Sequence, residues 1–116
     1  MVVMTLFSAS LRLVGLSQSE AADYFDVRLD TVKSWSAGRN KVPEGVWAQL
    51  RELYEVQIVA VEEAMELVRE QRPAEISLNE NGPRGKDWPS RGVHMAVLAM
   101  CALDPDCPPI SIGSVQ

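Results

Sequence analysis

The stretch LSQSEAADYFDVRLDTVKSWSAGRNKVP, residues 16–43, decides how the first half of the chain folds. Ser17 is followed three residues later by Glu20, which is a capping-box pattern. The Ser17 hydroxyl can accept a hydrogen bond from the Glu20 amide, while the Glu20 carboxylate reaches back to the Ser17 amide. The pattern predicts a helix that begins after Ser17 and runs to about Phe25.

A second helix is predicted directly after the first. A tight connection at Asp26-Val27 leads into a helix over 29–37, with Gly38 in the position after its end. Two helices that cross closely need small and apolar side chains at fixed offsets. Counted from Gln18 as position one, the fifth position must be small, and the tenth, fifteenth and eighteenth must be apolar. Those positions hold Ala22, Val27, Val32 and Trp35.

Further helices are predicted on both sides of this pair. A short helix runs from Thr5 to Val14 and stops at Gly15. A long helix has Pro43 in its first turn and continues to Glu70 or Gln71. Apolar residues recur along the long helix at spacings of three and four, which indicates one continuous stripe. The stripe consists of Trp47, Leu50, Tyr54, Ile58, Val61, Met65 and Val68. It is longer than a short bundle needs, so part of it is expected to meet another subunit.

The last third of the chain predicts a small α+β tail. AEISL (74–78) is a plausible strand, and NENGPRGKDWPS (79–90) is a loop rich in Gly and Pro. Ser90 is expected to cap a helix from Arg91 to about Ala102. The short run ISI (110–112) is expected to pair with ISL as a second strand. The predicted fold is therefore mainly α, with a small α+β region at the end.

Charge is distributed unevenly along the chain. The 116 residues carry a formal net charge of −5 and are 47% hydrophobic, which is ordinary for a folded protein. Residues 46–75 hold three basic and seven acidic side chains, a net −4. Residues 28–41 hold four basic side chains against Asp30 alone, a local +3. Local charge decides where a polyanion docks, so this segment is the candidate for a nucleic-acid contact.

Several classes of protein are not supported by the sequence. No apolar run approaches the roughly 20 residues of a membrane span. The first residues carry no basic segment before their apolar part, so no signal peptide is predicted and the cytoplasm is expected. His94, Cys101 and Cys107 match no common zinc spacing, and the two cysteines are expected to be thiols. No metal, cofactor or catalytic cluster is predicted, and the chain is not expected to be an enzyme.

The segment GLSQSEAADYFDVRLDTVKSWSAGRNKVP (15–43) resembles the Cro/repressor-type (XRE) helix-turn-helix family. The family has a Gln at the start of its second helix, a W-x-x-G-(K/R) ending to its third, and a Pro opening the next. Those features are matched by Gln18, Trp35, Gly38, Arg39 and Pro43. The resemblance covers about residues 5–55. It departs at two positions, because Asp26 replaces a frequent Gly and Arg28 replaces the usual capping Ser.

The overall layout also resembles the anti-CRISPR-associated repressors of phages and mobile elements. The shared feature is a G-R-x-x-V-P junction at 38–43, followed by a long helix and a short dimerising tail. The resemblance implies a helix-turn-helix DNA-binding domain over 1–55 and a long-helix continuation with an α+β dimerisation region over 56–116. It also implies a homodimeric repressor that binds an inverted repeat in double-stranded DNA and represses its own operon.

In this family the third helix lies in the major groove, with its first residues toward base edges. Arg28 and Lys33 can donate to guanine, Asp30 can accept from cytosine, and Leu29 can contact a thymine methyl. The expected base contacts are Arg28, Leu29, Asp30, Lys33 and Ser34. The expected phosphate contacts are Gln18, Ser19, Arg39, Asn40 and Lys41.

Other interpretations of these residues remain open. The four cations could form a solvated surface, and Asp30 could cap its helix or pair with Lys33. Arg84, Lys86 and Arg91 could form a second contact, to RNA, or a solvated loop. The chain could also be an antitoxin that binds a toxin and its own promoter, or a protein-interaction adaptor with a helix-turn-helix fold.

Overall fold

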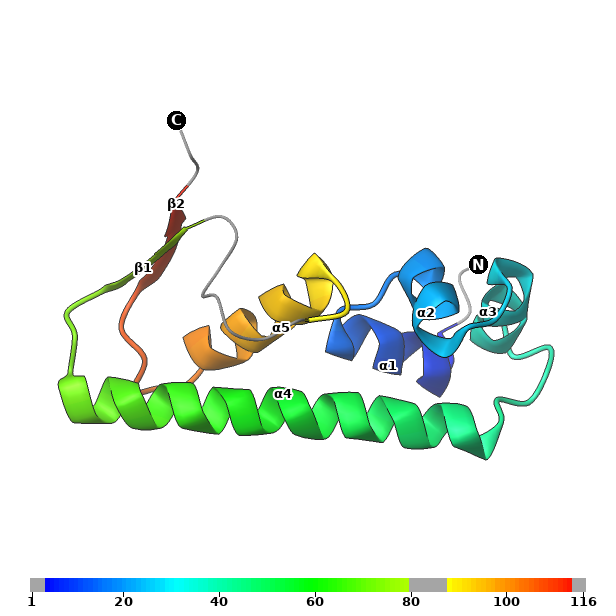
Figure 1. Cartoon of the computed structure of the whole chain (residues 1–116), viewed down its shortest axis with the longest axis horizontal. Coiled ribbons are helices and arrows are strands. Elements are labelled where there is room, and N and C mark those ends of the chain that lie inside the picture. Colours follow the sequence, from blue (N-terminus) through cyan, green and yellow to red (C-terminus); the bar gives the residue numbers. More distant parts are fainter. Residues whose placement is uncertain (1–3, 80–87, 114–116) are drawn as a thin grey trace.

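The computed structural model describes residues 4–79 and 88–113. Within these ranges the chain is mainly helical, with five helices and a small two-stranded sheet, as predicted. The long helix α4 extends along the whole molecule, with α1, α2 and α3 at its amino end and the strands at its carboxyl end (Figure 1). In chain order the elements are α1 (Leu6–Val14), α2 (Gln18–Phe25), α3 (Leu29–Ser36), α4 (Glu44–Gln71), β1 (Ile76–Asn79), α5 (Arg91–Ala102) and β2 (Ile110–Gly113).

The first two helices begin with reciprocal side-chain caps. The Ser17 hydroxyl accepts from the Glu20 amide at 3.1 Å, and the Glu20 carboxylate accepts from the Ser17 amide at 2.9 Å, as predicted. Thr5 and Ser8 form an equivalent box at the start of α1, which the sequence reasoning missed. Each box satisfies backbone donors that the first helical turn would otherwise leave without partners.

The connection between α2 and α3 has the backbone that its residues predict. Asp26 adopts the left-handed conformation, with φ 55° and ψ 51°. Asp tolerates this region better than most residues. The Val27 amide then donates to the Ala22 carbonyl at 2.9 Å, which closes the end of α2. Arg28 occupies the cap of α3 without a capping side-chain bond, as its replacement of Ser implies.

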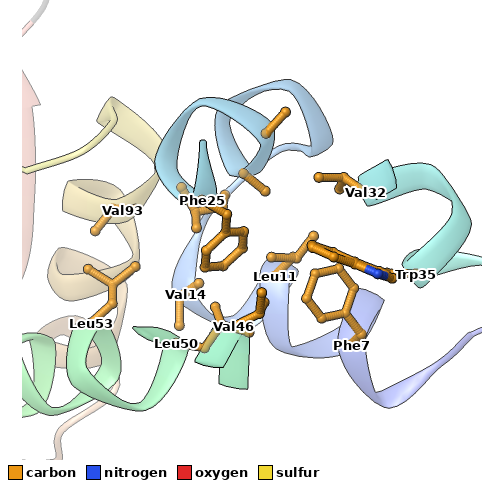
Figure 2. Packing of buried hydrophobic residues seen from close by; sticks show 13 residues of the cluster. Phe7, Leu11, Val14, Phe25, Val32, Trp35, Val46, Leu50, Leu53 and Val93 are labelled. Carbon is orange, nitrogen blue, oxygen red and sulfur yellow. The ribbon is translucent and has the colours of Figure 1, made fainter. Parts of the chain in front are cut away.

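An aromatic cluster forms the centre of the core at this end of the molecule. Phe7 of α1 makes edge contacts with Trp35 of α3, at 5.7 Å between centroids, and with Trp47 of α4, at 5.9 Å. Phe25 lies 6.4 Å from Phe7 and closes the cluster from α2. Figure 2 shows the rings of Phe7, Phe25 and Trp35 between the helices, with Leu11 beside them. We call this cluster and the apolar side chains packed around it the amino-terminal core.

The buried face of α4 differs from the predicted stripe. Pro43 occupies the N-cap position of α4, one residue before the first turn in which it was expected, and makes no side-chain capping bond. The fully buried positions are Val46, Leu50, Leu53, Gln57 and Met65. Trp47 is half-buried, and Tyr54 is 40% exposed. Leu50 and Met65 are buried as expected, whereas Val46, Leu53 and Gln57 are buried in place of their neighbours Trp47, Tyr54 and Ile58. Apolar residues occupy two adjacent faces of α4, and periodicity alone did not separate them.

The distal region, from Ile58 of α4 onward with α5 and the strands, has fewer buried side chains. Met65 of α4 is buried there, with Val97 and Cys101 of α5, whereas Val93 in the first turn of α5 belongs to the amino-terminal core. The two strands pair in parallel, with Ile76 opposite Ile110, which confirms the predicted pairing and supplies its direction. Arg69 forms ion pairs of 3.1 Å with Asp104 and with Asp106, and these pairs hold the segment after α5 against α4. None of the described helices is both long and apolar enough to cross a membrane.

Candidate nucleic-acid interface

The outer face of α3 is exposed and carries most of the expected base contacts. Val32 is fully buried and Trp35 is 7% exposed, so the inner face of α3 is held in the amino-terminal core. The opposite face presents Arg28, Leu29, Asp30 and Lys33 to solvent. Because buried positions three residues apart fix the rotation of a helix, these four side chains cannot turn inward without unpacking Trp35.

Ser34 differs from the other candidates on α3. It is half-buried, and its hydroxyl oxygen accepts a hydrogen bond of 2.7 Å from the side-chain amide of Asn40. A residue expected at the bases is thus joined to one expected at the phosphates. The Ser34 hydroxyl hydrogen stays free to donate, and Asn40 is held in a defined position beside the end of α3.

The segment after α3 is folded back on the helix by its own backbone. Gly38 has φ 77°, a conformation that suits Gly. The Gly38 amide donates to the Trp35 carbonyl at 3.1 Å, and the Arg39 amide donates to the Ser34 carbonyl at 3.0 Å. This closure, typical of a helix that ends at Gly, leaves Arg39, Asn40 and Lys41 exposed in a short run beside α3.

The start of α2 presents two exposed residues, Gln18 and Ser19. The capping box uses the amides of Ser17 and Glu20. The amides of Gln18 and Ser19 find no acceptor among the described residues. Unpaired amides at the positive end of a helix are suited to bind an anion, so α2 can contribute to the same surface as α3.

The cations of this surface are not neutralised by neighbours. Within the described part of the chain, the ion pairs involve Arg51 and Arg69, and none involves Arg28, Lys33, Arg39 or Lys41. Neither alternative role for Asp30 is present there, because it caps no amide of α3 and forms no ion pair with Lys33. Among the described residues, the segment 28–41 therefore carries four cations without ion pairs and one carboxylate without a partner, while Asp23 and Asp26 are exposed on α2 and in the turn before α3.

Other candidate residues lie elsewhere. Trp35 is a core residue, as expected, and His94 stacks on Trp88 with the rings 6.3 Å apart. Among the described residues, no group of three or more His, Cys, Asp or Glu side chains is arranged to hold a metal ion. Arg84 and Lys86 lie outside the described residues, and Arg91 opens α5. The ten expected DNA contacts therefore lie on α2, on α3 with its cap, and in the segment after α3. Trp35, His94 and Arg91 do not belong to that set.

No family model matches this sequence, and a search of curated proteins finds no similar one.

Proposed function

We propose that the chain is a sequence-specific DNA-binding repressor that acts as a homodimer on an inverted-repeat operator. The observation that carries the proposal is the exposed, unpaired set Arg28, Asp30 and Lys33 on the outer face of α3. A helix with this composition fits the major groove, where Arg and Lys recognise guanine and Asp recognises cytosine. Together, α2 and α3 would act as a helix-turn-helix unit of the Cro/repressor type.

In this proposal the neighbouring segments hold the helix on the duplex. Arg39, Asn40 and Lys41 lie beside α3, and Gln18 and Ser19 offer free amides at the start of α2. Contacts of this kind bind phosphates and fix the register of the protein without reading sequence. The Asn40–Ser34 hydrogen bond would link the two kinds of contact, so that docking on phosphate positions Ser34 at a base edge.

Exposed apolar surface supports the homodimer. The radius of gyration is 16.1 Å, whereas a compact chain of this length has about 13 Å. Val56, Val59 and Leu67 of α4 are each about half exposed, and the two-stranded sheet leaves backbone groups unpaired at its edges. A small sheet of this kind is marginal by itself, so a second copy of the chain would stabilise the distal region.

Repression would follow from occlusion. A dimer places two copies of α3 about one helical turn apart on the same side of the duplex, and the bound protein covers the promoter against polymerase. The resemblance to anti-CRISPR-associated repressors favours the operon of the protein itself as the target. No catalytic residue or cofactor is needed for such a mechanism, and the cytoplasm is the proposed location.

The decisive experiment is selection of bound duplexes from a random pool with the full-length chain, combined with sedimentation of the complex. The expected result is a palindromic consensus bound by two chains. Selection of no consensus, together with co-purification of a protein partner, would favour the antitoxin or adaptor role instead. The matched control is the double variant Arg39→Glu with Lys41→Glu, which is expected to recover little DNA of any sequence.

A further inference from the structure

Gln57 is a fully buried polar side chain in the middle of α4, with 0% of its surface exposed. Its side-chain amide donates to two backbone carbonyls on two other helices. One is Val14 at the end of α1, at 2.9 Å, and the other is Val93 in the first turn of α5, at 3.2 Å. A single side chain of α4 thus bonds α1 and α5, through residues that lie 43 and 36 positions away from it in the sequence.

The orientation of this amide is imposed by its partners. Both neighbours are carbonyl oxygens, which can only accept, so the Gln57 nitrogen must face them. The Gln57 oxygen is consequently buried with no partner among the described residues. Burying an unpaired oxygen is unfavourable, and an apolar residue would avoid it. What the polar residue supplies at this position is the pair of donated hydrogen bonds to α1 and α5.

A second contact joins the same two helices at the backbone. A Cβ atom built on Gly15, which ends α1, would lie 2.1 Å from the carbonyl oxygen of Gly92 in α5. A Cβ built on Gly92 would lie 2.2 Å from the carbonyl oxygen of Gly15. Only two glycines allow this approach, since any side chain would meet backbone atoms that cannot move aside. Figure 1 shows α5 beginning beside the end of α1, above the middle of α4.

The Gln57 hydrogen bonds and the Gly15–Gly92 contact lie between the proposed DNA surface and the distal region. On one side, α1 leads into α2 and α3, which carry the proposed DNA contacts. On the other side, α5 leads to β2, and the two strands project away from the side of α4 near its carboxyl end (Figure 1). The distal region and the amino-terminal core are therefore held at a fixed angle by α4 and by the contact of α5 with α1.

We propose that Gln57, Gly15 and Gly92 form a clamp that sets the separation of the two α3 helices in the dimer, and hence the half-site spacing that the protein selects. This inference rests on the proposed function. The three residues are positioning residues, because they touch no DNA and act through the angle between the distal region and α3. A rigid connection favours one spacing strongly, whereas a loose one tolerates several.

The test uses the full-length protein and the duplex that it selects from a random pool. Gln57→Glu places a carboxylate against two carbonyl oxygens, and Gly92→Ala drives a methyl group into the Gly15 backbone. Both changes should release α5 from α1. The control is Gly45→Ala, since a Cβ at Gly45 meets nothing within 4 Å. Each protein is titrated with the selected duplex, with duplexes lengthened at the centre by one or two base pairs, and with a single half-site.

On duplexes lengthened at the centre, wild type and Gly45→Ala are expected to lose on the order of tenfold or more in affinity. On the same duplexes, Gln57→Glu and Gly92→Ala are expected to lose less than about twofold. Single half-site affinity should stay within about twofold for all four proteins, which also shows that the amino-terminal core is folded. Hydrogen exchange of the variants should increase in α5.

Three outcomes would overturn the clamp. Variants that keep the wild-type spacing profile would show that the junction does not set the spacing. Variants that keep the hydrogen-exchange protection of α1 to α3 but lose single half-site binding would show that the junction acts on the DNA surface itself, and variants that sediment as monomers would show a role in dimerisation. A wild-type protein that selects no duplex would instead refute the proposed function itself, so the two failures are distinguishable.

Discussion

The two ends of α4 differ in how completely they are packed. At the amino end, α1, α2 and α3 enclose a cluster of aromatic rings, and reciprocal caps fix the starts of α1 and α2. In the distal region, Arg69 holds the segment after α5 through exposed ion pairs, and Leu67 and Leu103 are 54% and 85% exposed. Exposed ion pairs contribute little to stability. The rings of the amino-terminal core are thus enclosed, whereas fewer side chains are buried in the distal region. Exposed apolar side chains occur in both, since Leu6 and Leu13 of α1 are 82% and 58% exposed.

This difference suggests a division of roles. A surface that recognises DNA must be rigid before it binds, because ordering side chains at the moment of contact reduces affinity. The packed inner face of α3 supplies that rigidity. A dimerising region can instead complete its packing when two chains meet. The clamp at Gln57 lies between the two regions and transmits the geometry of one to the other.

Truncation in the aromatic cluster should have the largest effect on stability. Phe7→Ala removes a ring that is 2% exposed and contacts three others, and should lower the free energy of unfolding by about 3–5 kcal/mol. Urea denaturation measures this loss. Met65→Ala removes a comparably buried side chain from the distal region and should increase hydrogen exchange there while leaving α1 to α3 protected. Equal exchange in both regions would contradict the distinction between them.

Substitutions on the proposed DNA surface should have the next largest effect. Arg28→Ala and Lys33→Ala should each cost about 1–3 kcal/mol at one base position and relax the preference there. The double variant Arg39→Glu with Lys41→Glu should weaken binding to all duplexes and flatten the dependence of affinity on salt. Titrations at several salt concentrations separate the two patterns.

The control for these substitutions comes from the distal region. Arg69→Ala removes an exposed cation far along α4 from α3 and should leave the affinity for a single half-site unchanged. If Arg28→Ala and the double reversal reduced binding equally on every sequence, the assignment of base and phosphate contacts would be wrong.

The two non-glycine residues with positive φ among the described ones offer a smaller and matched comparison. Asp26 has φ 55° between α2 and α3, and Arg72 has φ 48° at the end of α4. Glycine at either position removes left-handed strain and should gain up to about 1 kcal/mol. Asp26→Gly should raise the melting temperature of the whole chain, while Arg72→Gly should only slow hydrogen exchange near the strands. A lower melting temperature for Asp26→Gly would indicate a stabilising role for the carboxylate.

The cysteines give the smallest effect. Burial raises the pKa of the Cys101 thiol, and the nearby Cys107 and Asp104 raise it further. Burial also raises the pKa of Cys107, with Asp104 adding to it. A raised pKa leaves less reactive thiolate at pH 8 than the unfolded chain has. Alkylation followed by mass spectrometry should therefore be slow in the native protein, slowest at the buried Cys101, and fast at both in urea. Equal native rates would mean that Cys101 of α5 is not buried as described.

Much of the candidate site was predictable because its determinants are local. The Ser17–Glu20 cap, the left-handed Asp26 and the Gly38 ending act over three or four residues, and together they fix which residues begin and end α2 and α3. The alternation of Val32 and Trp35 with charged residues then fixes which face of α3 is exposed. The Asn40–Ser34 hydrogen bond was not predictable, because it depends on how the segment after α3 folds back.

By itself the sequence determined the helices, the Ser17–Glu20 cap, the tight turn at Asp26 and the excess of cations over 28–41, because these follow from neighbouring residues. The tertiary structure alone decided which face of α4 is buried, that the strands run parallel, and that Gln57 donates to both Val14 and Val93. The same holds for the contact between Gly15 and Gly92. These features depend on contacts between residues that are tens of positions apart, and periodicity along one helix carries no information about the backbone atoms that a distant helix will bring to it.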